Sequence, residues 1–189
     1  TSSTCVDVRM PGASLKDTAG GDFTGVDLSG ADLTGARVEN LARANLQGAN
    51  LTRARLTHVD GADLTGAVLT DAEVRFASFA GAKMVRAKCA GVQMGVNVHD
   101  MVGNDLTEAD FRGGRLWADL TLAKAVNAKF GKAWLRGSWV RTDLTGADLR
   151  AATLDGVDFT EAILKDADLT GATIKGSGVR AMLTGARME

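Results

Sequence analysis

Large apolar residues recur every five positions along most of this chain. The segment Ala-Asp-Leu-Thr-Gly occurs at 31–35, 62–66 and 167–171, and Ala-Asp-Leu-Arg-Ala at 147–151 keeps its first three positions. In each unit a small residue and a polar residue come before the large apolar residue, which we term the centre. Two further residues, polar or glycine, complete the unit. The centres run from Leu28 to Met188, with Cys89 at one of them.

A five-residue period fits neither the 3.6-residue turn of an α-helix nor the two-residue alternation of a flat strand. It is typical of a chain that turns a corner every five residues, with the small residue and the centre inside and the other three outside. Eight-residue steps after Leu15, Val38 and Leu56, a four-residue step from Val140, and a long step after Met94 interrupt the period. We interpret these steps as loops or bulges of one continuous solenoid.

The repeat resembles the A(D/N)LXX consensus of the pentapeptide-repeat family, and its style is similar to that of cyanobacterial and plastid members. The similarity extends from about Val8 to Met188. It implies an all-β fold, a right-handed quadrilateral β-helix, for which we expect about nine coils. We expect a single solenoid domain over residues 1–189, with an irregular start at 1–9.

Charged residues test the four-sided wrap independently, because those that precede every fourth centre should stack in neighbouring coils. On one face they are Arg37, Asp63, Lys83, Asp105, Lys124 and Asp143, and on the next face Lys88, Asp110, Lys129 and Asp148. The signs alternate through both series. Neighbouring coils lie about 4.8 Å apart, so this order brings opposite charges together. The alternation lapses where Asp168 would stack beside Asp148.

The composition excludes several classes of function. Hydrophobic residues make up 45% of the chain but aromatic residues only 5%, so many small side chains fill the coil. We expect no interior pocket of the roughly 300 Å³ that a small-molecule site needs, hence no small-molecule substrate. The net charge of −1 argues against a general nucleic-acid binder. No apolar run approaches the roughly 18 residues of a membrane span.

Catalytic and metal-binding constellations are not expected either. His58 and His99 lie in irregular steps far apart in the sequence, without nearby cysteine or carboxylate clusters at metal-ligand spacing, so we interpret both as surface residues. Cys89 is expected to be a buried small hydrophobe, several coils from Cys5. Cys5 is then a free thiol or a link to another chain. The many aspartates are ladder residues, so the sequence predicts no enzyme, no cofactor and no metal.

Charge is unevenly spread along the coils. Residues 1–73 carry a net −4, residues 74–141 a net +6 and residues 142–189 a net −3, and all three tryptophans fall in the basic middle. One interpretation is a self-satisfied ladder with two cation–π pairs, Arg115 with Trp134 and Trp117 with Arg136. The other is a docking face for a protein partner. It comprises Arg115, Trp117, Trp134, Arg136 and Trp139, with Lys129, Lys132 and Arg141 at its rim. Trp139 favours this interpretation, because its expected neighbours are Asp119 and Asp158.

The repeat continues to Met188 and no capping helix is evident in the C-terminal segment. A solenoid coil left uncovered exposes apolar and strand groups, so we expect this end to meet another chain or to fray. We therefore predict a non-enzymatic scaffold that binds protein partners, an accessory subunit of a larger assembly.

The family resemblance adds an expected location and complex to this prediction, and one alternative function. Some members similar in style reside in the thylakoid lumen, and Thr1 in place of methionine fits a cleaved leader. We expect a subunit of a photosynthetic membrane complex on the lumen side, or otherwise a cytoplasmic protein. The alternative is a DNA mimic that binds DNA gyrase, as in some bacterial members. The basic middle and the missing C-terminal helix depart from that group. A nucleic-acid partner is not expected, because arginine and tryptophan of the basic middle face one another.

Overall fold

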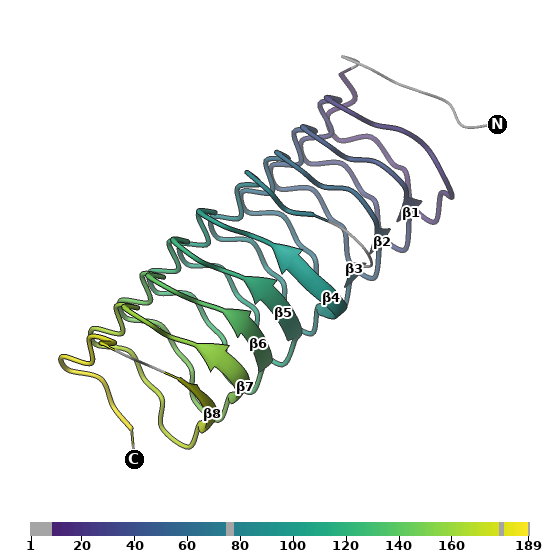
Figure 1. Ribbon diagram of the computed structural model, residues 1–189. Coiled ribbons are helices and arrows are strands. Elements are labelled where there is room, and N and C mark those ends of the chain that lie inside the picture. The colour runs from purple at the N-terminus through teal and green to yellow at the C-terminus, as the bar shows by residue number, and fades with distance from the viewer. Residues whose placement is uncertain (1–8, 75–77, 178–179, 189) are drawn as a thin grey trace.

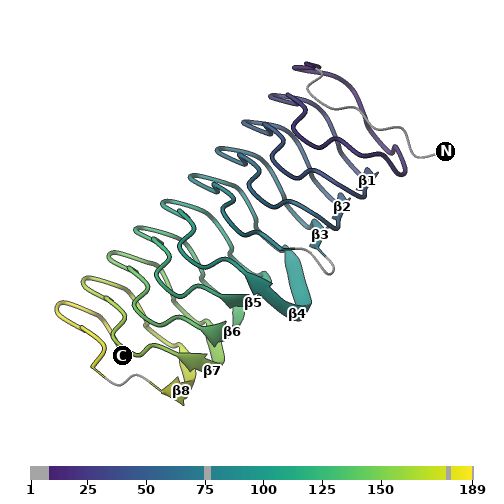
Figure 2. The ribbon, with the colours of Figure 1, turned by 45° about the horizontal axis from the view of Figure 1, so that its top comes forward.

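The computed structural model describes residues 9–74, 78–177 and 180–188. The chain winds into a rod of stacked coils, with its termini at opposite ends (Figures 1 and 2). Cys5 and the predicted irregular start lie outside the described residues, except Arg9, which already pairs with Asp27 of the next coil. The described residues include no helix long and apolar enough to cross a membrane.

The repeat unit folds as its residue types require, as the segment 31–35 illustrates. Ala31 and Leu33 are fully buried. The Asp32 carboxylate accepts hydrogen bonds from the backbone N–H of Thr34 at 3.0 Å and from its hydroxyl at 2.6 Å. Gly35 has a φ of 69°, the left-handed region that glycine tolerates best. The aspartate and the glycine together turn the corner, so the predicted inward and outward positions are confirmed.

One side of the rod is a parallel sheet of eight strands in sequence order. The strands are β1 (Arg37–Val38), β2 (Arg55–Leu56), β3 (Glu73–Val74), β4 (Gln93–Asp100), β5 (Arg115–Asp119), β6 (Trp134–Ser138), β7 (Thr153–Asp158) and β8 (Thr173–Ser177). The longer strands continue around a corner onto the next side. The segment after Met94, predicted to be a loop or bulge, belongs to β4, and its pairing with β5 shifts register between Met94 and His99, as a bulge would make it do. The predicted all-β solenoid is confirmed.

The predicted count of about nine coils was slightly high. The strands β1 to β8 make about seven turns. Beyond them the wrap continues only through isolated bridges, such as Arg9 with Asp27 at one end and Asp168 with Arg187 at the other. The prediction counted the apolar centres of these ends as full coils, like those of the regular middle.

Isolated bridges join the coils on two further sides and confirm most of the charge alternation. Asp63, Lys83, Asp105, Lys124 and Asp143 stack in that order, as do Lys88, Asp110, Lys129 and Asp148. The predicted lapse is also present, because Asp148 pairs with Asp168.

Arg37 was wrongly placed in the first of these series. It pairs with Arg55 on the β1–β2 side instead. The error arose because the eight-residue steps after Val38 and Leu56 hide two additional buried residues, Leu41 and Val59. Each completes a side of its coil that the five-residue period passes over.

The buried apolar residues form one continuous core along the rod. Cys89 lies in it, fully buried, and burial raises the pKa of its thiol, so the predicted inert cysteine is confirmed. Three predicted inward centres are instead exposed at the C-terminal end, namely Ile174, Leu183 and Met188. They belong to the last described coils, where a following coil does not cover them.

Candidate functional site

The predicted cation–π ladder lies on β5 and β6. These strands pair Arg115 with Trp134 and Trp117 with Arg136. The Arg115 guanidinium carbon lies 5.0 Å from the centre of the Trp134 ring, and that of Arg136 lies 5.5 Å from the centre of the Trp117 ring. Trp134 remains 38% exposed, whereas Trp117 is half-buried. The ladder is therefore confirmed, and Trp134 is its accessible aromatic face.

Trp139 does not belong to this surface, contrary to the sequence prediction. It is fully buried and packs between Phe130 and Phe159, with ring centroids 5.2 and 5.7 Å away. The step from Leu135 to Trp139 is four residues long, as is the step from Leu116 to Leu120 on the paired strand β5, and Gly137 with a φ of 123° lies within it. The register shifts between β6 and β7 because Leu154 and Val157 are three positions apart where Leu135 and Gly137 are two. Trp139, rather than the predicted Val140, is the buried centre of its side.

The predicted rim residues separate into different places. Lys129 lies in the charge ladder of the preceding side, bridged to Asp110 and Asp148. Arg141 stands at the corner after buried Trp139, where its Nε donates to the Glu161 carboxylate at 2.7 Å. Neither the buried Trp139 nor the paired Arg141 fits the predicted docking face. Lys132 occupies the corner two residues before Trp134, ahead of the start of β6.

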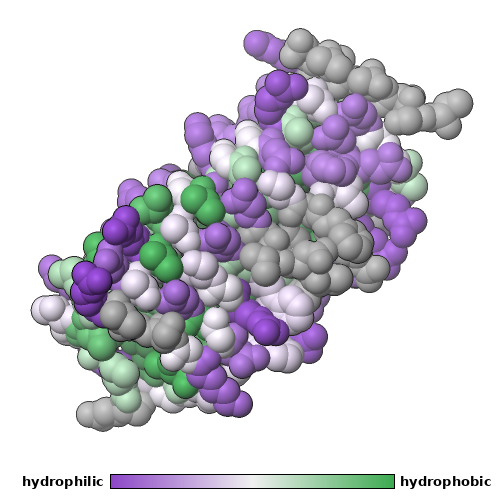
Figure 3. Space-filling view, in the orientation of Figure 1, coloured by the Kyte–Doolittle hydropathy of each residue, from purple (hydrophilic) through white to green (hydrophobic). Residues whose placement is uncertain are grey.

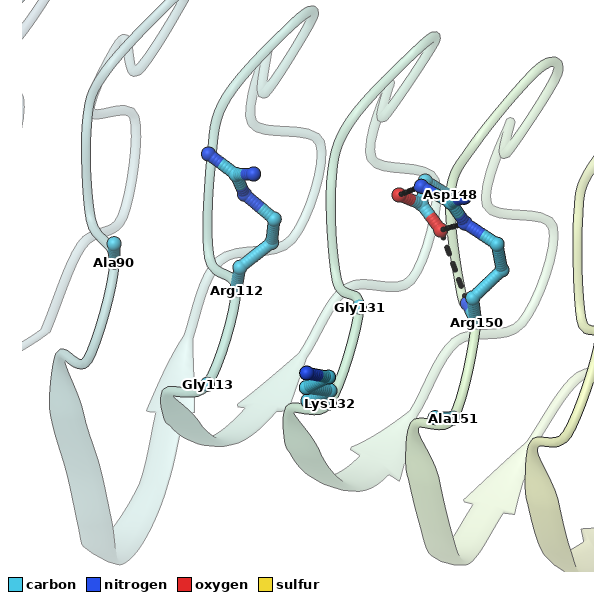
Figure 4. Close-up of a pocket in the computed structure, with 8 residues that line it drawn as sticks. All are labelled: Ala90, Arg112, Gly113, Gly131, Lys132, Asp148, Arg150 and Ala151. Carbon is cyan, nitrogen blue, oxygen red and sulfur yellow. Dashed lines mark hydrogen bonds and ion pairs between the residues drawn. The ribbon is translucent and has the colours of Figure 1, made fainter.

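At the corner that precedes β6, four successive coils form a surface groove of about 580 Å³. The predicted absence of a pocket concerned the interior, and this hollow lies outside it. The groove is lined by Ala90, Arg112, Gly113, Gly131, Lys132, Asp148, Arg150 and Ala151 (Figure 4). Arg112 and Arg150 stand on the two coils that flank the coil of Gly131, and Lys132 follows Gly131 at the turn.

Repeat register explains why the groove exists. Arg112, Gly131 and Arg150 each follow directly after a buried centre, so they hold equivalent positions in neighbouring coils. Gly131 carries no side chain and leaves a notch between two arginines. At the next position Lys132 stands between Gly113 and Ala151, which are too small to fill the space. The sequence analysis missed Arg112 and Arg150, although aligning the coils by their centres would have found them.

Each arginine of the groove is held by the aspartate two residues before it. Nη2 of Arg112 donates to Asp110 at 2.6 Å, and Nη2 of Arg150 donates to Asp148 at 2.7 Å. In both pairs Nε donates to the same carboxylate. These hydrogen bonds are bidentate, which fixes the planes of the guanidinium groups.

The ion pairs keep these carboxylates charged. Hydrogen bonds from Arg150 lower the pKa of Asp148, against the effect of burial. Burial is the largest influence on Asp110 and raises its pKa, but the hydrogen bonds and charge of Arg112 together outweigh it, so its pKa is also lowered. The same contacts raise the pKa of both arginines. Lys132 has no such partner among the described residues, and the groove is therefore basic by one charge.

Aspartates of the repeat accept hydrogen bonds from the backbone at the turns. Asp63 and Asp143, for example, each accept the N–H of the residue two positions later at 3.0 Å. Across the described ranges no three histidine, cysteine or acidic side chains are grouped to hold a metal ion. His58 is exposed, with Nδ1 2.9 Å from the carbonyl oxygen of Glu39, as expected of a surface residue. The side chain of His99 lies outside the described part of the chain.

The C-terminal end carries a separate apolar surface. Exposed apolar residues gather near this end on the face seen in Figure 3. A small hollow of about 120 Å³ lies among Phe159, Leu164, Leu169, Ile174, Gly176, Ala181, Leu183 and Met188. Ile174 and Leu183 are 43% and 44% exposed there. The surface differs from the basic groove in having no charged residue at its lining.

Five-residue units coiled into a four-sided parallel β-helix define a class of solenoid proteins. The family model for pentapeptide repeats matches eight copies, over residues 20–40, 57–88 and 141–177. Over these residues the chain carries the repeats of the pentapeptide-repeat family.

Solved structures agree with this assignment to different degrees. The chain is 27% identical to HetL, a pentapeptide repeat protein involved in heterocyst differentiation regulation from the cyanobacterium Nostoc sp. strain PCC 7120. The match covers 97% of this chain and 88% of HetL, with a TM-score of 0.62. No curated protein matches the chain in sequence.

Two further likenesses are looser. A trypsin-treated form of QnrB1, a plasmid-mediated fluoroquinolone resistance protein, is 19% identical over 97% of this chain and 92% of that chain, with a TM-score of 0.32. A pentapeptide repeat protein of the Arabidopsis thaliana thylakoid lumen is 23% identical over 75% of this chain and 66% of that chain, with a TM-score of 0.20. Fits this loose carry no argument about function.

Proposed function

We propose that this chain is a non-enzymatic scaffold that binds a protein partner as an accessory subunit of a larger assembly. The observation that carries the proposal is the exposed Trp134 ring, stacked with Arg115 beside the basic groove. Tryptophan and arginine are the residue types that most often anchor protein interfaces. A coil filled with packed side chains holds them in a fixed arrangement, so little order is lost on binding.

The partner surface consists of Arg115, Trp134, Arg136 and Lys132. Trp117 supports this surface, because the Arg136 guanidinium stacks on its half-buried ring. The ladder and the docking face are therefore compatible, since a stacked arginine still presents its outer face and its N–H groups. Lys129 borders the surface, whereas Trp139 and Arg141 are left out of it for the reasons given above.

The apolar C-terminal surface is the second contact that we propose for an assembly. Ile174, Leu183 and Met188 are exposed there, and large side chains of this kind gain free energy when a partner removes them from water. A scaffold with two separate surfaces can bring two chains together. This property suits an accessory subunit better than an enzyme.

A finer proposal is a subunit of a photosynthetic membrane complex on the thylakoid-lumen side. Its support is the Ala-Asp-Leu-Thr-Gly style of the repeat and the likeness to a cyanobacterial protein. The alternative of a gyrase-binding DNA mimic has less support. Acidic residues of the ladders alternate with lysines, which leaves no continuous acidic surface on those sides.

Affinity capture from the source organism, followed by mass spectrometry, tests the proposal. Wild type is compared with the double variant Trp134→Ala/Arg136→Ala and with Leu122→Ala, which removes an exposed apolar side chain (58% exposed) away from the partner surface. We expect a stoichiometric partner that the double variant loses and the control keeps.

The identity of the captured protein separates the finer proposals. A subunit of a photosynthetic complex supports the lumen-side proposal, and gyrase subunits support the DNA mimic instead. Equal capture by all three proteins contradicts the partner surface. Capture of nothing by wild type contradicts the scaffold proposal itself.

A further inference from the structure

We propose that the groove around Gly131 binds carboxylates of an acidic protein segment. The inference rests on the proposed scaffold function and names the chemistry of its partner. The ligand carboxylate would lie in the notch above Gly131, between Arg112 and Arg150, with the Lys132 ammonium as its third donor.

The notch has the dimensions of such a ligand. Arg112 and Arg150 stand two coils apart, about 9.6 Å at one strand spacing per coil. Gly131 places no side chain between them, and the Asp148 carboxylate borders this notch on the Arg150 side (Figure 4). A carboxylate bridges two guanidinium groups across a gap of this order. The floor of Ala90, Gly113 and Ala151 allows the ligand backbone to approach closely.

The arginines are prepared for a second acceptor. Each uses Nε and Nη2 for its own aspartate, and Nε of Arg150 also lies 3.9 Å from the Asp168 carboxylate. The Nη1 donors of both side chains remain for a ligand. Because Asp110 and Asp148 already fix the guanidinium planes, a ligand does not have to order these long side chains itself. Pre-organised donors of this kind favour carboxylate recognition.

Lys132 is the least constrained cation of the groove. It sits at the left-handed corner position, with a φ of 59°, where the preceding coil has Gly113. A side chain at this position is strained relative to glycine. Its ammonium extends from a corner with no ion pair among the described residues, and it borders the groove two residues before Trp134.

Charge and neighbourhood favour a protein carboxylate over a phosphate group. Arg112, Lys129, Lys132 and Arg150 lie among Asp110, Asp148 and Asp168, so the basic side chains exceed the acidic ones by one. A monoanionic carboxylate matches that excess, whereas a phosphate dianion carries one negative charge more than the excess. The exposed Trp134 ring next to the groove adds an apolar contact for a neighbouring side chain of the same segment.

Fluorescence anisotropy on the intact protein tests the proposal. The probe is a fluorescein-labelled decapeptide of alternating glutamate and leucine, and its counterpart has glutamine in place of every glutamate. We expect the glutamine peptide to bind at least about tenfold more weakly, since charge-assisted hydrogen bonds are about twice as strong as neutral ones. Binding of the acidic peptide should weaken as salt rises.

Two variants place the peptide in the groove. Lys132→Gly removes the ammonium and restores the glycine of the preceding coil, and it should weaken binding about fivefold to tenfold. Lys124→Ala removes the same charge from an exposed ladder position outside the groove and should change binding less than about twofold. Thermal melts of both proteins show that folding is retained.

Gly131→Glu supplies a carboxylate from the protein itself. A Cβ at Gly131 would lie 3.5 Å from the Arg150 carbonyl oxygen and 3.7 Å from both carboxylate oxygens of Asp148, and the φ of Gly131 is not left-handed. The backbone accommodates the change, and the added carboxylate stands beside Asp148. We expect the variant to lose peptide binding, and a thermal melt measures the cost of the like charge. Gly131→Gln fills the same space without charge and should weaken binding less. A difference between the two variants shows that the added carboxylate, and not only the filled space, blocks the peptide.

Several results would overturn the proposal. Equal binding of both peptides, or wild-type affinity in Lys132→Gly and Gly131→Glu, excludes carboxylate recognition by the groove. Tighter competition by inorganic phosphate or by vesicles of anionic lipid would assign the groove to phosphate groups. Self-association that Lys132→Gly abolishes would make a second copy of this chain, through its acidic ends, the occupant.

The two proposals fail separately. Partner capture that depends on Trp134, with no peptide binding, keeps the scaffold and removes the groove inference. Peptide binding that depends on Gly131 and Lys132, with no captured partner, keeps the groove as an anion site and removes the scaffold.

Discussion

Trp139 packs against Phe130 with their ring centroids 5.2 Å apart, inside the coil rather than on its surface. Phe130 also stacks on Phe111 at 5.5 Å, and Phe159 meets the Trp139 ring edge-on. In a core built chiefly from leucine and alanine, this aromatic group supplies an unusually large contact area at the middle of the rod.

Truncation of Trp139 should therefore lower the free energy of unfolding more than truncation of any surface tryptophan. We expect Trp139→Ala to lower the free energy of unfolding by about 3–5 kcal/mol. Trp134→Ala, which removes an exposed ring, should cost about 1 kcal/mol or less. Urea denaturation of the two variants measures the difference. A near-wild-type midpoint for Trp139→Ala would contradict the buried position of this residue.

Gly137 should also be sensitive to substitution, because it lies within the four-residue step that turns Trp139 inward. A Cβ at this position would overlap the Ala118 carbonyl group of the preceding coil, and the φ of 123° is unfavourable for other residues. We expect Gly137→Ala to destabilise the protein and to change its near-UV circular dichroism. Gly156→Ala has a φ of 71° and open space around the added Cβ. This control should lower the free energy of unfolding by only about 1 kcal/mol. Equal losses in the two variants would show that the contact with Ala118 is unimportant.

The cation–π ladder makes a prediction about coupling. In a double-mutant cycle of Arg115→Ala and Trp134→Ala, the interaction should contribute about 0.5–1 kcal/mol to the free energy of unfolding. Arg136 with Trp117 should behave similarly, since the geometry is nearly the same. A cycle of Arg115 with Trp117, which are not stacked on each other, provides the baseline. Coupling no larger than this baseline would mean that the stacking is not energetically significant.

The small inward residues leave no room for larger ones. Ala62 and Ala147 are fully buried, and leucine at either position should cost about 1–3 kcal/mol through overpacking. Ala80→Leu makes the same substitution at an exposed alanine and should be close to neutral. Thermal melts compare the three variants. Wild-type melting of Ala62→Leu and Ala147→Leu would contradict their inward assignment.

Acid should weaken the fold through its aspartates. The pKa of Asp148 is lowered from 3.8, chiefly by the Arg150 hydrogen bond. A lowered folded-state pKa gives stability that is present above the unfolded value and is lost as pH falls through the folded value. Asp148→Asn keeps the oxygen that accepts the backbone N–H of Arg150, as Asn45 does for Gln47, but it cannot titrate. Unfolding followed from about pH 5 to about pH 3 should show a smaller loss for the variant, and parallel curves would exclude this contribution.

The repeat alone determined the class of fold and most of the inward positions. A period of five with small and large apolar residues two apart can bury both only if the chain turns after each unit. The charge order of Lys83, Asp105, Lys124 and Asp143 added the number of sides, because stacked coils place like positions one strand spacing apart. The partners of Trp117 and Trp134 followed from the same register.

Only the tertiary structure decided what happens where the period slips. A four-residue step from Leu135 turns Trp139 inward, and Leu41 and Val59 complete sides that the five-residue spacing does not reveal. A slip of one residue exchanges inside for outside, so sequence spacing cannot locate it without the backbone angles. The groove depended on the structure for a similar reason. Arg112, Gly131 and Arg150 follow one another at intervals of 19 residues along the chain. They meet only because each coil brings the same corner back to the same place.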